Sequence, residues 1–153
     1  SGSSPRAPWY AADEELKLFM MDRKDDVQNN VLPALDRNCV VLMDRYYFSS
    51  AAYQGARGLD PEEIKTRNEE FAPRPDLVII LQVPAAVGIG RIQRERRPRS
   101  YFEQEEYLAR VQEIFGELEG PNIHHLDATL SPEQVHLRVR ELAEKLLRDT
   151  TEA

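Results

Sequence analysis

Apolar residues recur at intervals of three and four near the start of the chain, as they do on one face of an α-helix. The series runs from Leu16 to Leu35, and Asp13 stands where a carboxylate that caps a helix is expected. We therefore predict one long amphipathic helix that starts at Asp13. Pro33 lies inside the series. Because proline has no N–H group for the helical hydrogen bonds, we expect a kink near the end of this helix.

Three short apolar runs lack this spacing and are typical of strands. They lie at residues 40–43, 77–83 and 123–126. None alternates cleanly between apolar and polar residues, which is the pattern of strands covered on both faces. Four further helical patterns occur at residues 62–71, 85–94, 103–118 and 132–147. Strands joined through helices form parallel sheets, so we expect an α/β fold whose parallel sheet is covered by helices on both faces.

The polar ends of these patterns suggest the domain boundaries. Residues 1–12 are predicted to be a linker or disordered end, and residues 13–150 one domain. The last helix starts with Ser131-Pro132-Glu133-Gln134, which is a capping box with proline at the first helical position. Three strands are few for such a sheet, so we expect that strands on its amino-terminal side are missing from this chain.

The composition of the 153 residues is that of a globular domain, with 41% apolar and 31% charged residues. The net charge of −7 repels polyanions and argues against a nucleic-acid partner. The longest apolar run, residues 77–81, is far shorter than the ~20 residues that span a bilayer, so no membrane partner is expected. A single cysteine, Cys39, excludes an internal disulfide. We therefore expect a cytoplasmic protein with Cys39 in its core.

Polar residues directly follow the first apolar run, at the end where open α/β sheets bind ligands. Asp44 and Arg45 stand there and lead into residues 46–55, an aromatic and hydroxyl-rich segment that we interpret as a loop lining a pocket. An arginine can hold a phosphate through a bidentate pair, and an aspartate can hold a hydrated magnesium ion. The alternative is a structural ion pair at the end of a strand.

Phe19 and Arg23 form a second candidate pair, because a spacing of four places a ring and a guanidinium group on one helical face. Stacking by the ring and donation by the guanidinium would suit recognition of a nucleobase. The alternative is a core phenylalanine beside a solvated arginine.

A cluster of arginines interrupts the acidic chain. Its members are Arg91, Arg94, Arg96, Arg97 and Arg99. We interpret residues 91–102 as a lid that closes over phosphates, and the alternatives are a solvated basic face or a weak nucleic-acid patch. Two of the three histidines, His124 and His125, are adjacent on a predicted strand and would face opposite sides, so we expect no histidine metal site.

Residues 42–54, Leu-Met-Asp-Arg-Tyr-Tyr-Phe-Ser-Ser-Ala-Ala-Tyr-Gln, resemble the signature of thymidylate kinases, which phosphorylate dTMP with ATP. Further matching motifs extend over nearly the whole chain: Leu18-Phe19 with Arg23, Gly58-Leu59-Asp60-Pro61, Pro75-Asp76-Leu77, Phe102-Glu103 and Leu126-Asp127-Ala128. The resemblance implies the fold of the P-loop nucleoside-monophosphate kinases. It also implies a phosphotransferase of dTTP biosynthesis that uses Mg²⁺ and ATP, binds nucleotides and forms a homodimer.

The resemblance assigns substrate binding to a set of residues: Phe19, Arg23, Ser49, Ser50, Tyr53 and Gln54. Phe19 would stack on the pyrimidine, and Arg23 would reach its carbonyl edge or the monophosphate. Ser50 would face the base edge, Tyr53 would pack against the sugar, and Gln54 would complete the pocket.

The resemblance likewise assigns the residues around the phosphates. Arg45 would hold the acceptor phosphate, and Asp44 would lie near the phosphates and bind magnesium through water. The transferred phosphoryl group would receive positive charge from the lid, with these candidates: Arg94, Arg96, Arg97 and Arg99.

The sequence departs from the family pattern at three places. It contains no G-x-x-x-x-G-K-[S/T] motif, although this loop cradles the donor phosphates in the family. Gln82 stands where the family often has an acidic residue, and Ser100-Tyr101 where it often has Asp-Arg. We expect an amino-terminal segment with the missing loop to precede Ser1. The alternative functions are a non-catalytic nucleotide-binding module and a kinase for another nucleoside monophosphate.

Overall fold

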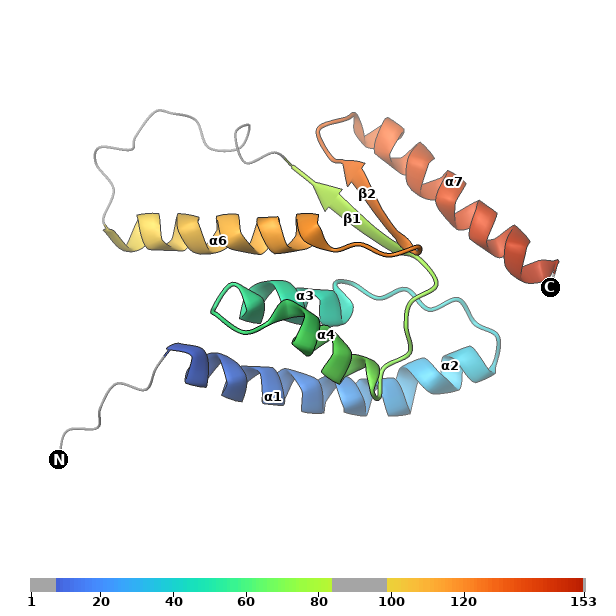
Figure 1. The fold of residues 1–153 in the computed structure, drawn as a ribbon. Helices are drawn as coiled ribbons and strands as arrows, with labels where there is room; N and C mark the ends of the chain where they lie inside the picture. The colour runs from blue at the N-terminus through green and yellow to red at the C-terminus, as the bar shows by residue number, and fades with distance from the viewer. Residues whose placement is uncertain (1–7, 84–98, 153) are drawn as a thin grey trace. The chain divides into compact units, whose positions relative to one another are not determined.

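The computed structural model describes residues 8–83 and 99–152 (Figure 1). The chain divides into two units, Ser1–Arg74 and Pro75–Ala153. The described part of the first unit is helical, and that of the second contains a pair of strands. None of the described helices is both long enough and apolar enough to cross a membrane. The helix predicted at residues 85–94 lies outside the described residues.

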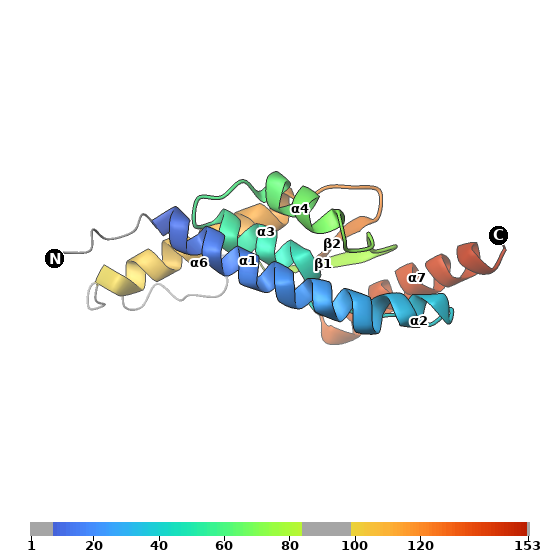
Figure 2. The ribbon, with the colours of Figure 1, turned by 90° about the horizontal axis from the view of Figure 1, so that it is seen from below.

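The first helical pattern forms one rod of three segments (Figures 1 and 2). These are α1 (Pro8–Asp26), the π-helical segment η1 (Val27–Val31) and α2 (Leu32–Asp36). The predicted start at Asp13 is wrong, because α1 begins at Pro8, and proline is favourable at a helix start where N–H groups have no helical partner. Asp13 lies within α1, and its carboxylate pairs with Lys17 Nζ at 2.9 Å.

Near Pro33, where we predicted a kink, the hydrogen bonding of the helix changes. The Leu32 N–H donates to the carbonyl of Val27, five residues earlier, where an α-helix would use the residue four earlier. Pro33 follows in the first turn of α2. Its ring removes one N–H donor, and a π-helical turn immediately before it adjusts the backbone to that loss.

The other helices of the first unit are α3 (Tyr46–Gly55) and α4 (Pro61–Glu69), and α3 packs against both α4 and α1. Leu16, Ala51 and Ile64, one from each of these helices, form a core cluster that is at most 2% exposed. The interpretation of residues 46–55 as a loop is therefore wrong. Their buried side chains follow helical spacing, which the high content of hydroxyl and aromatic groups obscured.

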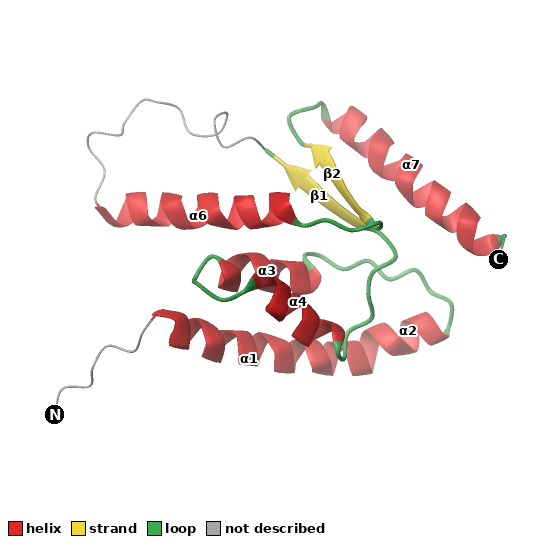
Figure 3. Cartoon of the chain, viewed as in Figure 1, coloured by secondary structure: helices red, strands yellow, loops and turns green. Residues whose placement is uncertain are grey.

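The strand predicted at residues 40–43 is also wrong. This segment belongs to the loop between α2 and α3 (Figure 3), with Val40 71% and Leu42 91% exposed. A strand is stable only when a neighbouring strand pairs with its N–H and carbonyl groups, and no described residue pairs with this segment in a sheet. Cys39, which we expected in the core, is exposed in the same loop.

The second unit confirms the parallel arrangement of the other two predicted strands. Strand β1 (Val78–Gln82) pairs with β2 (Ile123–Asp127), and the register runs from Val78 opposite Ile123 to Gln82 opposite Asp127. The strand pair lies between α6 (Arg99–Glu117) and α7 (Pro132–Thr151) in Figures 1 and 2. The α/β class with a parallel sheet is therefore confirmed.

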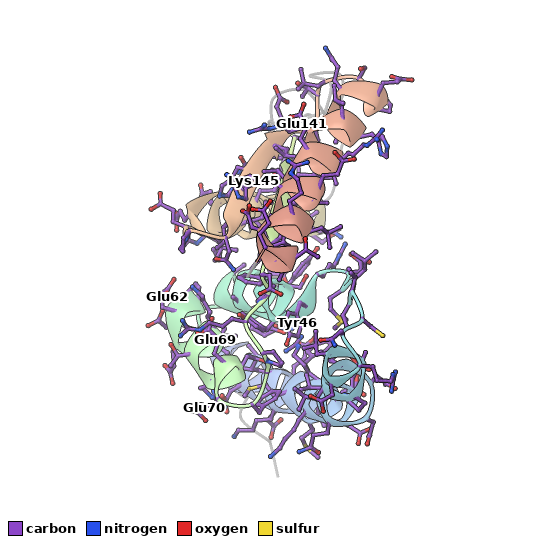
Figure 4. The ribbon with its side chains drawn as sticks, turned by 90° about the vertical axis from the view of Figure 1, so that its right-hand side faces the viewer. Tyr46, Glu62, Glu69, Glu70, Glu141 and Lys145 are labelled. Atoms are coloured by element: carbon purple, nitrogen blue, oxygen red, sulfur yellow. The ribbon has the colours of Figure 1, made fainter. Side chains whose placement is uncertain are left out.

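The two helices of the second unit differ in how far they are buried. Val111, Ile114 and Leu118, at helical spacing in and just after α6, are at most 4% exposed, and α6 packs against β1. Helix α7 has no fully buried residue, and side chains such as Glu141 and Lys145 extend from it (Figure 4). Its predicted capping box is confirmed, since the Gln134 N–H donates to Ser131 Oγ at 3.2 Å.

The core cluster of the first unit generates a prediction about stability. Leu16 is fully buried, so Leu16→Ala should lower the free energy of unfolding of the intact protein by about 2–5 kcal/mol, measured by urea denaturation. Leu137→Ala on α7, where the side chain is 56% exposed, is the control and should change it by less than about 0.5 kcal/mol. Equal effects of the two substitutions would contradict the assignment of the core.

Candidate functional site

A strained turn precedes α3. Arg45 has φ 69° and ψ −44°, and the Tyr46 N–H donates to the Asp44 carbonyl at 2.9 Å, which makes these three residues a γ-turn. Tyr46 also has a positive φ, 50°. Residues with a Cβ rarely adopt such angles, and each typically costs about 1–3 kcal/mol. Strain of this kind persists only where the surrounding contacts hold the backbone.

The hydroxyl groups of two tyrosines supply such contacts. Tyr46 Oη donates to the Pro73 carbonyl at 3.0 Å, and Tyr47 Oη donates to Glu69 Oε1 at 3.0 Å. Figure 4 labels Tyr46, at the start of α3, and Glu69, at the end of α4. Burial and the Glu69 carboxylate raise the pKa of Tyr47, so its hydroxyl remains a donor at neutral pH. The beginning of α3 is thereby attached to the end of α4 and the loop after it.

The Arg45 side chain extends from this turn toward solvent. Its Nη1 donates to Tyr53 Oη at 3.4 Å, and its guanidinium carbon lies 5.7 Å from the centre of the Tyr53 ring. Asp44 is also exposed, and no ion pair joins Asp44 to Arg45 in the described part of the chain. The alternative of a structural ion pair is therefore wrong. An exposed guanidinium group steadied by a ring is suited to binding an anion.

Arg23 has the opposite environment, because it is half-buried among α1, α3 and α4. Its Nη1 donates to Asn68 Oδ1 at 2.7 Å, and its Nη2 donates to Ser50 Oγ at 3.0 Å and to the Tyr46 carbonyl at 3.3 Å. Burial lowers the pKa of Arg23, and the nearby Tyr46 and Asp22 act in the opposite direction. A solvated Arg23 is excluded. The structure brings Arg23 and Ser50 together, as a shared site requires.

Asn68 contacts the candidate site residue Arg23, and the sequence analysis missed it. Its side chain is 0% exposed, and besides accepting from Arg23 it donates from Nδ2 to the Ile64 carbonyl at 2.8 Å. The sequence does contain a feature that indicates this residue. Asn68 is an amide four residues after the buried Ile64, at a position of the α4 pattern where an apolar residue is expected. Polar residues at core positions generally have hydrogen-bond partners, so such a position indicates a specific contact.

Phe19 lies one helical turn before Arg23 on α1, and its side chain is 46% exposed. The alternative of a core phenylalanine is therefore wrong. An aromatic ring exposed to this extent beside a half-buried cation leaves a face on which a planar ligand can stack.

Two further side chains of α3 contain buried oxygen atoms that lack hydrogen-bond partners among the described residues. They are Ser49 Oγ and Gln54 Oε1, and Gln54 as a whole is 3% exposed. Gln54 follows Ser50 by one helical turn, so both stand on the same face of α3. A buried polar atom without a partner costs about 1–3 kcal/mol, which a ligand with a complementary donor would offset.

The predicted lid falls mostly outside the described residues. Arg94, Arg96 and Arg97 lie outside the described residues. Arg99 begins α6, so the last four residues of that lid, 99–102, belong to a helix. Within the described part of the chain, no three His, Cys, Asp or Glu side chains are grouped as a metal site.

Comparison with known proteins identifies one family. The family model described as thymidylate kinase matches residues 8–139. A thymidylate kinase of Akkermansia muciniphila is 45% identical over 85% of this chain and 63% of its own length. A probable thymidylate kinase of Archaeoglobus fulgidus is 43% identical over 88% of this chain and 68% of its own length. This chain therefore spans about two thirds of the length of these relatives.

The positive φ of Arg45 generates a prediction that separates backbone strain from side-chain chemistry. Arg45→Gly and Arg45→Ala both remove the guanidinium group, but only glycine adopts this backbone without cost. The glycine variant of the intact protein should therefore be more stable than the alanine variant by about 1 kcal/mol in urea denaturation. Greater stability of the alanine variant would contradict the strained turn.

Proposed function

Because the chain belongs to the thymidylate kinase family, we propose that the protein transfers a phosphoryl group from ATP to dTMP, giving ADP and dTDP for dTTP biosynthesis. The observation that supports this substrate most directly is a half-buried arginine donor that contacts Ser50, one helical turn before Gln54, whose buried side-chain oxygen lacks a partner among the described residues. The ATP and magnesium requirements are part of the proposal.

The base would bind along the face of α3 that carries Ser50 and Gln54. Thymine presents a carbonyl at position 4 and an N–H at position 3, whereas cytosine presents an amino group and an unprotonated nitrogen. Arg23 offers N–H donors, and Gln54 Oε1 offers a buried acceptor. These groups can form hydrogen bonds with thymine, whereas cytosine would place a donor against the donors and an acceptor against the acceptor. Of the two roles implied for Arg23, we therefore favour the carbonyl edge of the base.

Phe19 and Tyr53 would contact the flat and apolar parts of the nucleotide. The half-exposed ring of Phe19 would stack on the pyrimidine. Tyr53, already in contact with the Arg45 guanidinium, would pack against the sugar. Both side chains would contribute mainly to binding, because stacking changes little between the ground state and the transition state.

Arg45 would hold the phosphate of dTMP. It is exposed, no carboxylate neutralises it in the described structure, and it extends from a turn whose strained backbone is held by the tyrosine contacts. Asp44 adjoins it and could bind magnesium through water. A single exposed carboxylate fits the usual binding of this ion, which keeps several waters and takes further ligands from phosphates. Magnesium would supply positive charge to the phosphoryl oxygens.

The parts of the reaction that involve ATP depend mainly on residues outside the described structure. The lid arginines Arg94, Arg96, Arg97 and Arg99 remain proposed suppliers of positive charge to the transferred group. The loop that would cradle the donor phosphates is not among the 153 residues, and we propose that the intact protein provides it.

We also propose that the protein forms a homodimer. Leu18, Met21, Leu32 and Leu35 of α1 and α2 are 38–69% exposed. Their successive spacings are three, eleven and three residues, close to whole numbers of helical turns, so they follow one side of the rod. An exposed apolar stripe of this kind can be covered by a second copy of the chain.

A substrate comparison tests the proposed function. The intact protein should phosphorylate dTMP faster than dUMP, UMP, CMP or AMP in an ATP- and Mg²⁺-dependent assay that measures ADP release. Arg45→Ala should reduce turnover of dTMP at least about 100-fold, because a lost phosphate contact removes transition-state stabilisation. Arg37→Ala, which removes another exposed arginine, is the control and should leave turnover unchanged. Preference for another monophosphate would reassign the substrate, and normal turnover by Arg45→Ala would remove Arg45 from the site.

The stacking role of Phe19 predicts a different kinetic pattern. Phe19→Ala should raise KM for dTMP about tenfold and change kcat less than about threefold, because a stacked base loses similar binding energy in both states. Steady-state kinetics with varied dTMP measures both constants. Lys24→Ala, at another exposed position of α1, should leave KM unchanged. An unchanged KM in Phe19→Ala would exclude stacking on this ring.

A further inference from the structure

Asn68 is a completely buried amide with both ends hydrogen-bonded. Its Oδ1 accepts from Arg23 Nη1 at 2.7 Å, and its Nδ2 donates to the Ile64 carbonyl at 2.8 Å. Rotating the amide by 180° would place its NH₂ group against the guanidinium and its oxygen against a carbonyl. Both contacts would be repulsive, so the surroundings permit one orientation of the amide.

The backbone of Asn68 is fixed as firmly as its side chain. Its carbonyl accepts from the N–H groups of Phe71 and Ala72, at 3.2 and 2.9 Å, where α4 ends. The acceptor that faces Arg23 therefore stands on a rigid part of the first unit. Since a guanidinium group is planar, fixing one Nη1 bond together with the two Nη2 bonds determines the direction of the whole group.

The acceptors around Arg23 are all uncharged. Asn68 Oδ1, Ser50 Oγ and the Tyr46 carbonyl take three of its five N–H groups, and no carboxylate is hydrogen-bonded to it in the described structure. The positive charge of the group is therefore not cancelled by a direct ion pair. No described residue accepts a hydrogen bond from Nε or a second one from Nη1, so these N–H groups can donate to a ligand.

We propose that Asn68 is a positioning residue for substrate recognition, which directs the Arg23 guanidinium toward the base while leaving its charge uncompensated. This inference rests on the proposed function, because the ligand of Arg23 is taken to be the carbonyl edge of dTMP. Asn68 itself touches no substrate and acts only through Arg23. The amide suits this task better than a carboxylate, which would form an ion pair with Arg23 and lose the donor to Ile64.

Binding of dTMP to the intact protein, measured by isothermal titration calorimetry, tests the proposal. Asn68→Ala should weaken binding about tenfold, because the guanidinium loses its fixed direction. Asn68→Asp keeps the volume of the side chain and should also weaken binding about tenfold, because the carboxylate pairs with the cation. In both variants the ratio of dTMP affinity to dCMP affinity should fall, since Arg23 would no longer select the carbonyl.

A double-mutant cycle separates positioning from a merely structural role. In an Arg23→Ala background, Asn68→Ala should change dTMP affinity less than about twofold, whereas independent effects would multiply. Val31→Ala is the control, because it removes buried side-chain volume from the same unit, in η1, at a position outside the proposed site. It should lower stability in urea and leave dTMP affinity and the dTMP to dCMP ratio unchanged.

The outcomes distinguish failure of this inference from failure of the proposed function. A wild-type protein that does not bind dTMP would overturn both. If the wild-type protein binds dTMP, two results would overturn the positioning role alone. One is an unchanged dTMP affinity in Asn68→Asp. The other is a double mutant in which the effects of Asn68→Ala and Arg23→Ala on dTMP affinity multiply fully. If Asn68→Ala does not fold, as judged by circular dichroism, Asn68→Asp alone and in the Arg23→Ala background carries the same test.

Discussion

The guanidinium group of Arg23 connects α1, α3 and α4 at one point, and the arrangement of the first unit depends on it. Without this group, Asn68 Oδ1 would be buried and unpaired, at a cost of about 1–3 kcal/mol. The same contacts align the face of α3 that carries Ser50 and Gln54. A structural contact and a candidate recognition contact are thus made by different N–H groups of one side chain.

The strained turn at Arg45 is compatible with this arrangement because neighbouring groups hold it. The Tyr46 carbonyl accepts from Arg23, and the Tyr46 hydroxyl donates to Pro73. The backbone is therefore held at Tyr46, directly after Arg45 and its unfavourable angles. The two arginines also differ in burial. The half-buried Arg23 donates to uncharged oxygens, whereas the guanidinium group of the exposed Arg45 is available to bind a phosphate.

The errors in the predicted elements have a common cause. Each of these elements depends on contacts with residues that are distant in the chain, and the local sequence pattern does not contain those contacts. Residues 40–43 are apolar enough for a strand, but a strand also needs a partner that pairs with its backbone. Residues 46–55 contain enough hydroxyl and aromatic groups for a loop, but the packing of Ala51 against Leu16 and Ile64 favours a helix. Asn68 and Arg23 are 45 residues apart in the chain, so no local pattern indicates their contact.

The sequence by itself determined the features that depend on near neighbours in the chain. The capping box at Ser131 and the two strands that pair in the second unit could be identified from spacing and residue type, and the motif at residues 42–54 indicated the family. The tertiary structure decided which polar groups are buried and which of them are paired, and it left Gln54 Oε1 without a hydrogen-bond partner among the described residues. The physical reason is that burial and hydrogen-bond pairing depend on helices brought together in space, whereas caps and apolar periodicity depend on residues a few positions apart.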